Sequence, residues 1–192
     1  MIASETQAQG SRVRWLWVML VGALCLGVLL IVAAVPLAIK LGSFYPYRIS
    51  SESMAPTLYA GDKIFANQGY YAHHKLADGD IVVFRHGDLI LAKRISALPG
   101  ETIEGKDGKL FRNGVAFAEP YAVYSKKSPI PEIDTFALRK VPPGLIFVTG
   151  DSRDASLDSR TAEFGPVAIS DVLGRVSMVY MSSHRGQAGR TF

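Results

Sequence analysis

One stretch of the chain is continuously apolar, and it predicts a membrane-spanning helix. Residues 15–39 run for 25 positions without a charged side chain, between Arg14 and Lys40. A helix rises about 1.5 Å per residue, so this run is long enough to cross a hydrocarbon core roughly 30 Å thick with some tilt. The alternative is a cleavable signal peptide, because Val32-Ala33-Ala34 fits a small-residue cleavage site. The length of the run favours a retained anchor.

The charges that flank the apolar run barely decide its orientation. Basic residues lie on both sides, with Arg12 and Arg14 before the run and Lys40 and Arg48 after it. With the amino terminus included, the positive-inside rule leans slightly toward a cytoplasmic segment 1–14. We therefore expect the rest of the chain on the other side of the membrane.

Beyond the apolar run, the hydrophobic pattern changes to short β-branched and alternating segments. Turn signals such as Gly79-Asp80 and Asn113-Gly114 separate these segments. No sustained amphipathic helical pattern appears there. The fold class that follows is mostly β, a single domain of antiparallel sheets behind one N-terminal helix. The strands expected are 63–66, 81–85, 89–95, 145–149 and 171–181.

The same pattern divides the chain into segments. Residues 40–48 are expected to be a juxtamembrane linker, since they contain a glycine and a proline that break a helix. The folded domain is expected to cover 49–181, with a short irregular insertion at 116–140 that contains three prolines. Residues 182–192 form a polar tail that we expect to be disordered.

Composition excludes several classes of function. The net charge is +4, and basic and acidic residues are interspersed after residue 60. This argues against nucleic-acid binding and is compatible with weak attraction to anionic lipid headgroups in a bilayer. Cys25 is the only cysteine and lies in the apolar run, so neither an intramolecular disulfide nor a cysteine-rich metal site is possible.

A metal site elsewhere is also not expected. The polar stretch 150–160 contains three aspartates, but it lacks the spacing of a calcium loop and includes two arginines. We expect internal ion pairs in that loop, and we expect no cofactor or metal.

Ser53 is the candidate nucleophile suggested by its place shortly after the apolar run. A serine hydroxyl needs a base to take its proton. The four histidines lie in a polar loop, a turn and the tail, where histidines are usually just solvated. No histidine is therefore a strong candidate for the base.

Lys93 is an unusual residue for its position. Alternation along the strand 89–95 places it on the same face as Leu89, Leu91 and Ile95. Burial there would lower the pKa of the amine from its ordinary value and let it accept a proton. The alternative is an edge strand from which Lys93 extends its ammonium into water, and periodicity does not decide between the two. Arg94, on the opposite face, is expected to be solvated.

Three segments follow the apolar run in order. They are Ser-Met-x-Pro-Thr-Leu from Ser53, Lys93-Arg94 with Leu98-Pro99-Gly100 after it, and Gly-Asp-x-Arg-Asp-x-Ser-x-Asp-Ser-Arg from 150 to 160. Together they resemble the bacterial type I signal peptidases. They occur in the family's order behind a single anchor, and the resemblance covers about 49–174. It implies a monomeric serine endopeptidase of the bacterial inner membrane, with its domain outside the cytoplasm, that cleaves signal peptides from exported preproteins.

The resemblance also implies roles for individual residues. Ser53 would be the nucleophile and Lys93 the general base. The Ser53 backbone N–H and the Ser51 hydroxyl would form the oxyanion hole, and Ser156 would orient the lysine amine. The structural pair in the same loop would be Asp158 and Arg160.

The family cleaves after small residues at positions −1 and −3, which enter shallow apolar pockets. For Ile64, packing in the core is an equally good interpretation. Several residues depart from the family pattern. Ser50 stands where many members have proline, and Ser152 and Ala155 replace asparagines that are common in the last motif. Leu91 and Ala92 replace a bulkier pair before the lysine, and Ala92 would enlarge the −3 pocket. The positions that match pocket residues are Ile49, Met54, Leu58, Ile64 and Ala92.

Other classes of protein remain as alternatives. A self-cleaving repressor with a similar dyad would need a DNA-binding region, whereas residues 1–48 contain the apolar run. A plasmid-type or mitochondrial relative of the peptidase is not excluded. A non-catalytic β domain that holds partners near the bilayer would have no need of Ser51, Ser53 and Lys93.

Overall fold

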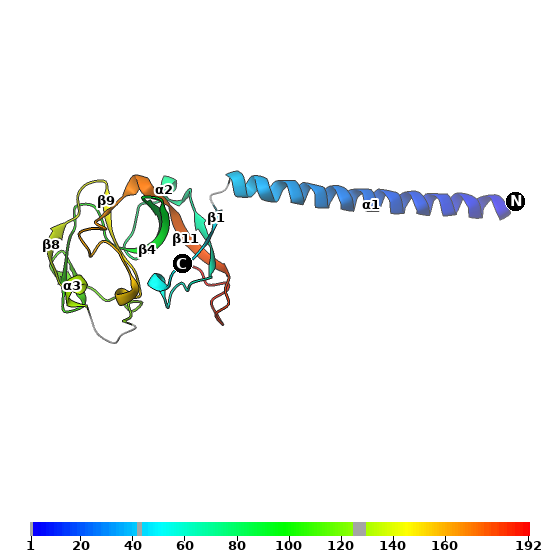
Figure 1. Ribbon diagram of the computed structural model, residues 1–192. Coiled ribbons are helices and arrows are strands. Elements are labelled where there is room, and N and C mark those ends of the chain that lie inside the picture. The colour runs from blue at the N-terminus through cyan, green and yellow to red at the C-terminus, as the bar shows by residue number, and fades with distance from the viewer. Residues whose placement is uncertain (1, 42–43, 125–129) are drawn as a thin grey trace. The chain divides into compact units, whose positions relative to one another are not determined.

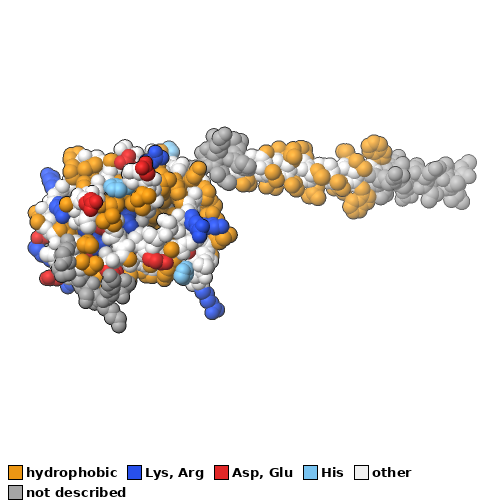
Figure 2. Space-filling view, in the orientation of Figure 1, with side chains coloured by type: hydrophobic (Ala, Val, Ile, Leu, Met, Phe, Trp, Pro, Cys, Tyr) orange, Lys and Arg blue, Asp and Glu red, His pale blue; other side chains and the backbone are white. Residues whose placement is uncertain are grey.

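The computed structural model describes residues 2–41, 44–124 and 130–192. The chain forms two compact units, Met1–Gly42 and Ser43–Phe192. Helix α1 (Ile2–Leu41) makes up the first unit, so the expected helix at 15–39 is confirmed and extends further toward the N-terminus. Its segment Trp17–Val35 is long and apolar enough to cross a membrane. Figure 2 shows hydrophobic side chains around this part of α1, which is compatible with a membrane anchor.

The second unit is built on a seven-stranded sheet in which every strand pair is antiparallel (Figure 1). The strand order is β1-β2-β11-β3-β4-β9-β10. The strands expected from the sequence are all present in it. Its members are β1 (Phe44–Arg48), β2 (Lys63–Asn67), β3 (Ile81–His86), β4 (Leu89–Ala97), β9 (Leu145–Thr149), β10 (Val167–Ala168) and β11 (Val172–Met181).

A smaller sheet of four strands, in the order β7-β6-β5-β8, completes the unit. In the described part of this unit, two short helices and three 3₁₀ segments lie in the connections. The strands are β5 (Thr102–Lys106), β6 (Lys109–Arg112), β7 (Val115–Ala116) and β8 (Phe136–Lys140). The helical segments are α2 (Tyr70–His73), α3 (Pro131–Asp134), η1 (Glu52–Met54), η2 (Arg153–Ala155) and η3 (Ile169–Asp171).

Two segments expected to be irregular contain strands. The end of the expected linker is strand β1, which pairs with β2. Pro46 is tolerated there because β1 is an edge strand, where a missing N–H need not break a ladder. The end of the expected insertion is β8, which pairs with β5 and buries Phe136 over Gly105. Residues 42–43 of the linker and 125–129 of the insertion lie outside the described residues.

Strand β3 has a core on both of its faces. Ile81 and Val83 belong to one hydrophobic cluster, and Val82 and Phe84 belong to another. Each such side chain contributes about 1.5–3 kcal/mol when it is fully buried. Because β4 pairs directly with β3, this double core gives β4 a rigid support.

The tail after β11 is ordered, so the expectation of disorder is wrong. The chain turns back along β11, where Thr191 forms a bridge with Met178 and Phe192 packs against the cluster that contains Met54. Arg190 Nη1 donates to the Thr57 carbonyl oxygen at 3.4 Å. These contacts join the tail to the loop that follows Ser53, which sequence periodicity could not indicate.

We predict that Phe192→Ala lowers the free energy of unfolding by about 1–2 kcal/mol. This is less than the 3–5 kcal/mol typical of a fully buried phenylalanine, because Phe192 is only half-buried. Denaturant unfolding measures the change. Arg185→Ala, an exposed position in the same tail, is the control and should stay within about 0.5 kcal/mol of the unmodified protein. Equal stability of the two variants would contradict the packing of the tail.

Candidate active site

Two segments 40 positions apart in the chain bring Ser53 and Lys93 together. Ser53 lies in η1, and Lys93 lies in β4. Lys93 Nζ donates a hydrogen bond to Ser53 Oγ at 2.5 Å. Both side chains are buried, with 6% of Ser53 and 3% of Lys93 exposed. A hydroxyl and an amine are therefore in direct contact and largely shielded from water.

The burial of Lys93 excludes the alternative in which its ammonium reaches solvent. Removal from water lowers the pKa of the Lys93 amine to about 8. The negative charges of Asp158 and Asp151 act in the opposite direction, and the Arg160 guanidinium supports the lowering. An appreciable fraction of the amine is therefore neutral near pH 8, and a neutral amine carries the lone pair that can accept a proton.

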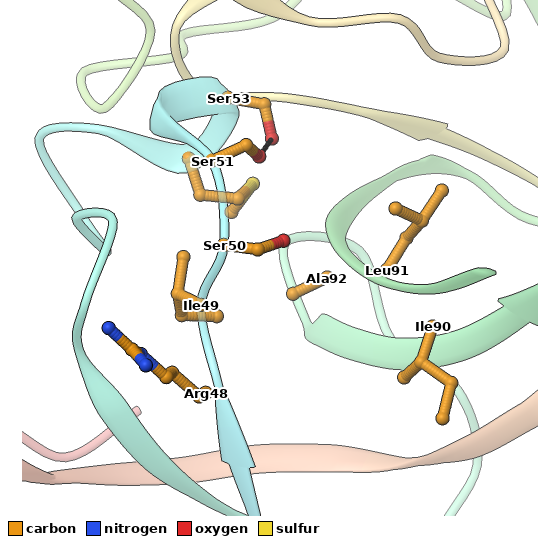
Figure 3. A pocket seen from close by; sticks show the side chains of 9 residues that line it. Arg48, Ile49, Ser50, Ser51, Ser53, Ile90, Leu91 and Ala92 are labelled. Atoms are coloured by element: carbon orange, nitrogen blue, oxygen red, sulfur yellow. Dashed lines mark hydrogen bonds between the residues drawn. The ribbon is translucent and has the colours of Figure 1, made fainter.

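Ser51 adds a second hydroxyl beside Ser53. The two Oγ atoms lie 3.1 Å apart, and either can be the donor. Figure 3 shows this contact and the chain that leads to it, with Ile49 and Ser50 on the approach. Ser51 is exposed, so its hydroxyl is open to a molecule that approaches Ser53.

The loop after β9 forms the second part of the site. Asp158 accepts hydrogen bonds from the Gly150 N–H at 2.9 Å, from Ser156 Oγ at 2.6 Å and from Arg160 Nε at 2.8 Å. Burial would raise the pKa of Asp158, but the hydrogen bonds and positive charge of Arg160 outweigh it and hold that pKa below its ordinary value. Arg160 also donates to Asp134 at 2.5 Å. The internal ion pair expected in this loop is therefore present.

Ser156 makes its hydrogen bond to Asp158. Its hydroxyl donates to that carboxylate, and among the described residues it makes no hydrogen bond to Lys93. The Lys93 amine instead donates to Ser53. Asp158 lies close enough to Lys93 for its charge to raise the pKa of the amine.

The backbone of the loop after β9 lies directly against the backbone at Ser53. The Ser152 N–H donates to the Ser53 carbonyl oxygen at 3.1 Å. A β-carbon added at Gly150 would collide with that oxygen and with the Ser156 side chain. Only glycine therefore fits between the two segments.

Arg94 is buried, although the sequence predicted that it would be solvated. It is 9% exposed rather than solvated, and it forms a double hydrogen-bonded ion pair with Asp151 at 2.9 and 2.7 Å. The same carboxylate accepts a hydrogen bond from Thr57 Oγ1 at 2.5 Å, and the guanidinium lies over the Tyr121 ring. The sequence did contain a sign of this burial, because Arg94 lies in an apolar strand. A charge in a strand that is buried on both faces needs a partner.

A small pocket of about 30 Å³ opens beside Ser51 and Ser53. In Figure 3 Ile49 lies on one side of this pocket, and Ile90 and Ala92 of β4 lie on the other. Met54 also lines it. Three of the five expected pocket residues therefore meet here: Ile49, Met54 and Ala92.

The other two expected pocket residues lie in the core. Leu58 and Ile64 are completely buried in the cluster that contains Met54, and neither lines the small pocket. They support the pocket from behind. Within the described parts of the chain, no group of three or more histidine, cysteine, aspartate or glutamate side chains is placed to hold a metal ion.

We predict that Gly150→Ala destabilises the protein by about 1–3 kcal/mol, the usual range for a side chain forced into a packed site. The added carbon meets the Ser156 side chain and also the Ser53 carbonyl oxygen, and this backbone atom cannot rotate away. Thermal or denaturant unfolding measures the loss. Gly27→Ala is the matched control, because no heavy atom lies within 4 Å of its added carbon. If both variants unfold like the unmodified protein, the close approach at Gly150 is not real.

Comparison with known proteins places the chain in a family. The model of the family "Signal peptidase, peptidase S26" matches residues 19–181. A signal peptidase I of Bacillus amyloliquefaciens is 35% identical over 163 residues, which cover 81% of this chain and 83% of that protein. Signal peptidase I S of Bacillus subtilis (strain 168) is 39% identical over 137 residues, covering 68% and 74%.

The chain is also similar to solved structures. A crystal structure of a signal peptidase I from Enterococcus faecalis V583 is 34% identical, with a TM-score of 0.44, and covers 54% of this chain and 98% of that one. The family match covers most of the chain and includes Ser51, Ser53, Lys93 and the loop after β9. The chain therefore belongs to the signal peptidase family, peptidase S26, and is a serine endopeptidase.

Proposed function

We propose that this protein releases exported preproteins from their N-terminal signal peptides, with Ser53 as nucleophile and Lys93 as general base. The observation that carries the proposal is the 2.5 Å contact between Ser53 Oγ and a buried Lys93 amine. Family membership supports the reaction class. The apolar helix α1 would anchor the enzyme in the bacterial inner membrane, with the domain on the extracytoplasmic side and the chain acting as a monomer.

The chemistry follows from this contact. The neutral Lys93 amine takes the Ser53 proton as Oγ attacks the carbonyl carbon of the scissile peptide bond. The protonated amine then gives that proton to the leaving amine, the C–N bond breaks and an ester forms on Ser53. Lys93 next takes a proton from a water molecule, whose oxygen attacks the ester. As the bond between the carbonyl carbon and Ser53 Oγ breaks, Lys93 returns that proton to Ser53 Oγ, and the signal peptide leaves with a free carboxyl group that ionises in water.

The negative oxygen of each tetrahedral intermediate needs hydrogen-bond donors. We assign this role to the Ser51 hydroxyl, 3.1 Å from Ser53 Oγ, and to the Ser53 backbone N–H at the start of η1. A donor aimed at the developing charge typically contributes about 2.7–4 kcal/mol. Ser51 is placed to do so because it comes from the same extended chain that leads into the nucleophile.

The free edge of β4 provides a place for the substrate. Strand β3 pairs with β4 from Leu89 to Arg94, whereas β9 pairs with the other edge only from Arg94 to Ala97. Among the described strands, none covers that edge from Leu89 to Lys93. An extended peptide can therefore add to the sheet there, with its backbone hydrogen-bonded to β4.

The small pocket would then select the residues next to the cut. Its volume of about 30 Å³ is close to that of one water molecule, so it accepts a methyl group and excludes larger side chains. We assign it to the small residue at position −1, and we expect the small residue at −3 of an Ala-x-Ala sequence to lie on the same face of β4. Ile49, Met54 and Ala92 provide its apolar walls.

We predict that Ser53→Ala and Lys93→Ala each reduce the cleavage of a purified preprotein by at least about 10³-fold, because each removes half of the dyad. Gel analysis of precursor and mature protein measures the rate. Ser170→Ala and Lys109→Ala, at exposed positions away from the site, are the matched controls. Normal processing by either dyad variant would refute the assignment of that residue.

The pH dependence of cleavage gives an independent test of the base. Lys93 works only when it is neutral, and burial lowers its pKa to about 8, so kcat/KM should rise with pH and reach half its maximum near pH 8. Two pH units lower, about one hundredth of the maximum should remain. Steady-state rates across this range provide the profile. A rate that is flat or that falls with rising pH would contradict a lysine base of this pKa.

A further inference from the structure

A second, larger cavity opens from the candidate dyad. It is a cleft of about 440 Å³ that is bordered by both Ser53 and Lys93 and extends away from them. Leu91 of β4 lies on one side, and Leu157 from the loop after η2 is also part of its wall. Neither the proposed chemistry nor the small pocket uses this space.

The two cavities lie on opposite faces of β4. Ile90 and Ala92 line the small pocket, whereas Leu89 and Lys93 line the cleft, and Leu91 borders both. Successive side chains of a strand point to opposite faces of a sheet. A peptide that adds to the edge of β4 alternates in the same way. If its residue −1 enters the small pocket and its residue −3 lies on the same face, its residue −2 must point into the cleft.

The walls of the cleft are mostly apolar. Leu157 is 60% exposed there, and a hydrophobic surface of that kind is available to pack against a long aliphatic stem. The His86 ring stacks on the buried Phe164 ring with 4.0 Å between ring centroids, which makes one wall flat and rigid. The cleft is far larger than a methyl group requires.

One acidic side chain gives the cleft a negative charge. Glu163 lies on its wall, is exposed and has no ion-pair partner within the described part of the chain. The other ionisable groups on the wall are His86 and Lys93. During catalysis Lys93 starts as a neutral base, so Glu163 is the group whose charge an incoming side chain meets.

We propose that this cleft is a subsite for the substrate residue at position −2, and that it selects lysine or arginine. The aliphatic stem of such a residue would pack on Leu91 and Leu157, and its cationic end would reach Glu163 at the solvent edge. The subsite rests on the proposed function, because it needs a peptide on the edge of β4. It goes beyond that function because it gives the enzyme a preference for a particular side chain at position −2, which the small pocket does not contact.

The test compares peptide substrates that differ only at −2, where they carry lysine, glutamine or glutamate between two alanines. For the unmodified full-length enzyme in detergent, kcat/KM should be about two- to fivefold higher for lysine than for glutamine, as expected for a solvent-exposed ion pair. It should be lowest for glutamate. The preference should shrink at high ionic strength, because salt screens exposed charges.

Substitutions at Glu163 then connect the preference to one residue. Glu163→Gln should abolish the difference between lysine and glutamate peptides, and Glu163→Lys should reverse it. Asp107→Asn removes an exposed carboxylate in the turn between β5 and β6 and should leave the preference intact. The ratio of two substrates within one variant does not depend on how much of that variant is folded.

The outcomes separate the two proposals. If the lysine-to-glutamate ratio is unchanged in Glu163→Gln, or if the unmodified enzyme shows no preference at −2, the subsite is overturned while the peptidase assignment stands. If no peptide is cleaved, or if Ser53→Ala cleaves as fast as the unmodified enzyme, the proposed function itself fails. A preference that vanishes in Glu163→Gln and reverses in Glu163→Lys supports the subsite.

Discussion

The burial of one lysine amine against one serine hydroxyl is the constraint on which the rest of the site depends. A charged ammonium is costly to remove from water, so its burial favours the neutral form. Two aspartates lie close enough to act against this, because the charges of Asp151 and Asp158 raise the pKa of Lys93. The amine stays near a pKa of about 8 only if those negative charges are balanced locally.

Two buried arginines pair with these aspartates. Arg160 pairs with Asp158, and Arg94 pairs with Asp151, each at hydrogen-bond distance and largely out of water. Removing either arginine would leave a buried carboxylate without its partner, which is far more costly than the loss of a surface pair. The positive charge of Arg160 also acts on Lys93 directly and helps to lower the pKa of its amine.

The sequence was sufficient for features that depend on local pattern. The apolar run predicted α1, and the β-branched segments predicted β3, β4 and β9. The strand pattern drew attention to Lys93 but left its burial open. Arg94 shows the limit of this approach. Whether a residue on the second face of a strand is solvated depends on what packs there, and Asp151 lies 57 positions away in the chain.

The remaining differences from the sequence prediction have the same physical origin. The hydrogen bond from Ser156 to Asp158 depends on three-dimensional geometry, which no local pattern in the sequence shows. The tail was expected to be disordered because it is polar, yet it is held by backbone hydrogen bonds to β11 and by the packing of Phe192. Strand β8 follows a proline-rich segment and is stabilised by Gly105, whose lack of a side chain leaves room for Phe136.

Successive side chains of β4 point to opposite faces of the sheet, and the two faces contribute to different parts of the site. The pairing register of β4 with its neighbours must therefore be fixed. Ile90 and Ala92 shape the small pocket, while Lys93 on the other face meets Ser53 and the larger cleft. A shift of one residue would exchange the two faces and remove the amine from the site. Arg94 opposes such a shift, because its guanidinium is bound at the same time to Asp151 and to the Gly79 carbonyl oxygen. The residue next to the candidate base thus holds the strand in the register that both the proposed chemistry and the proposed specificity need.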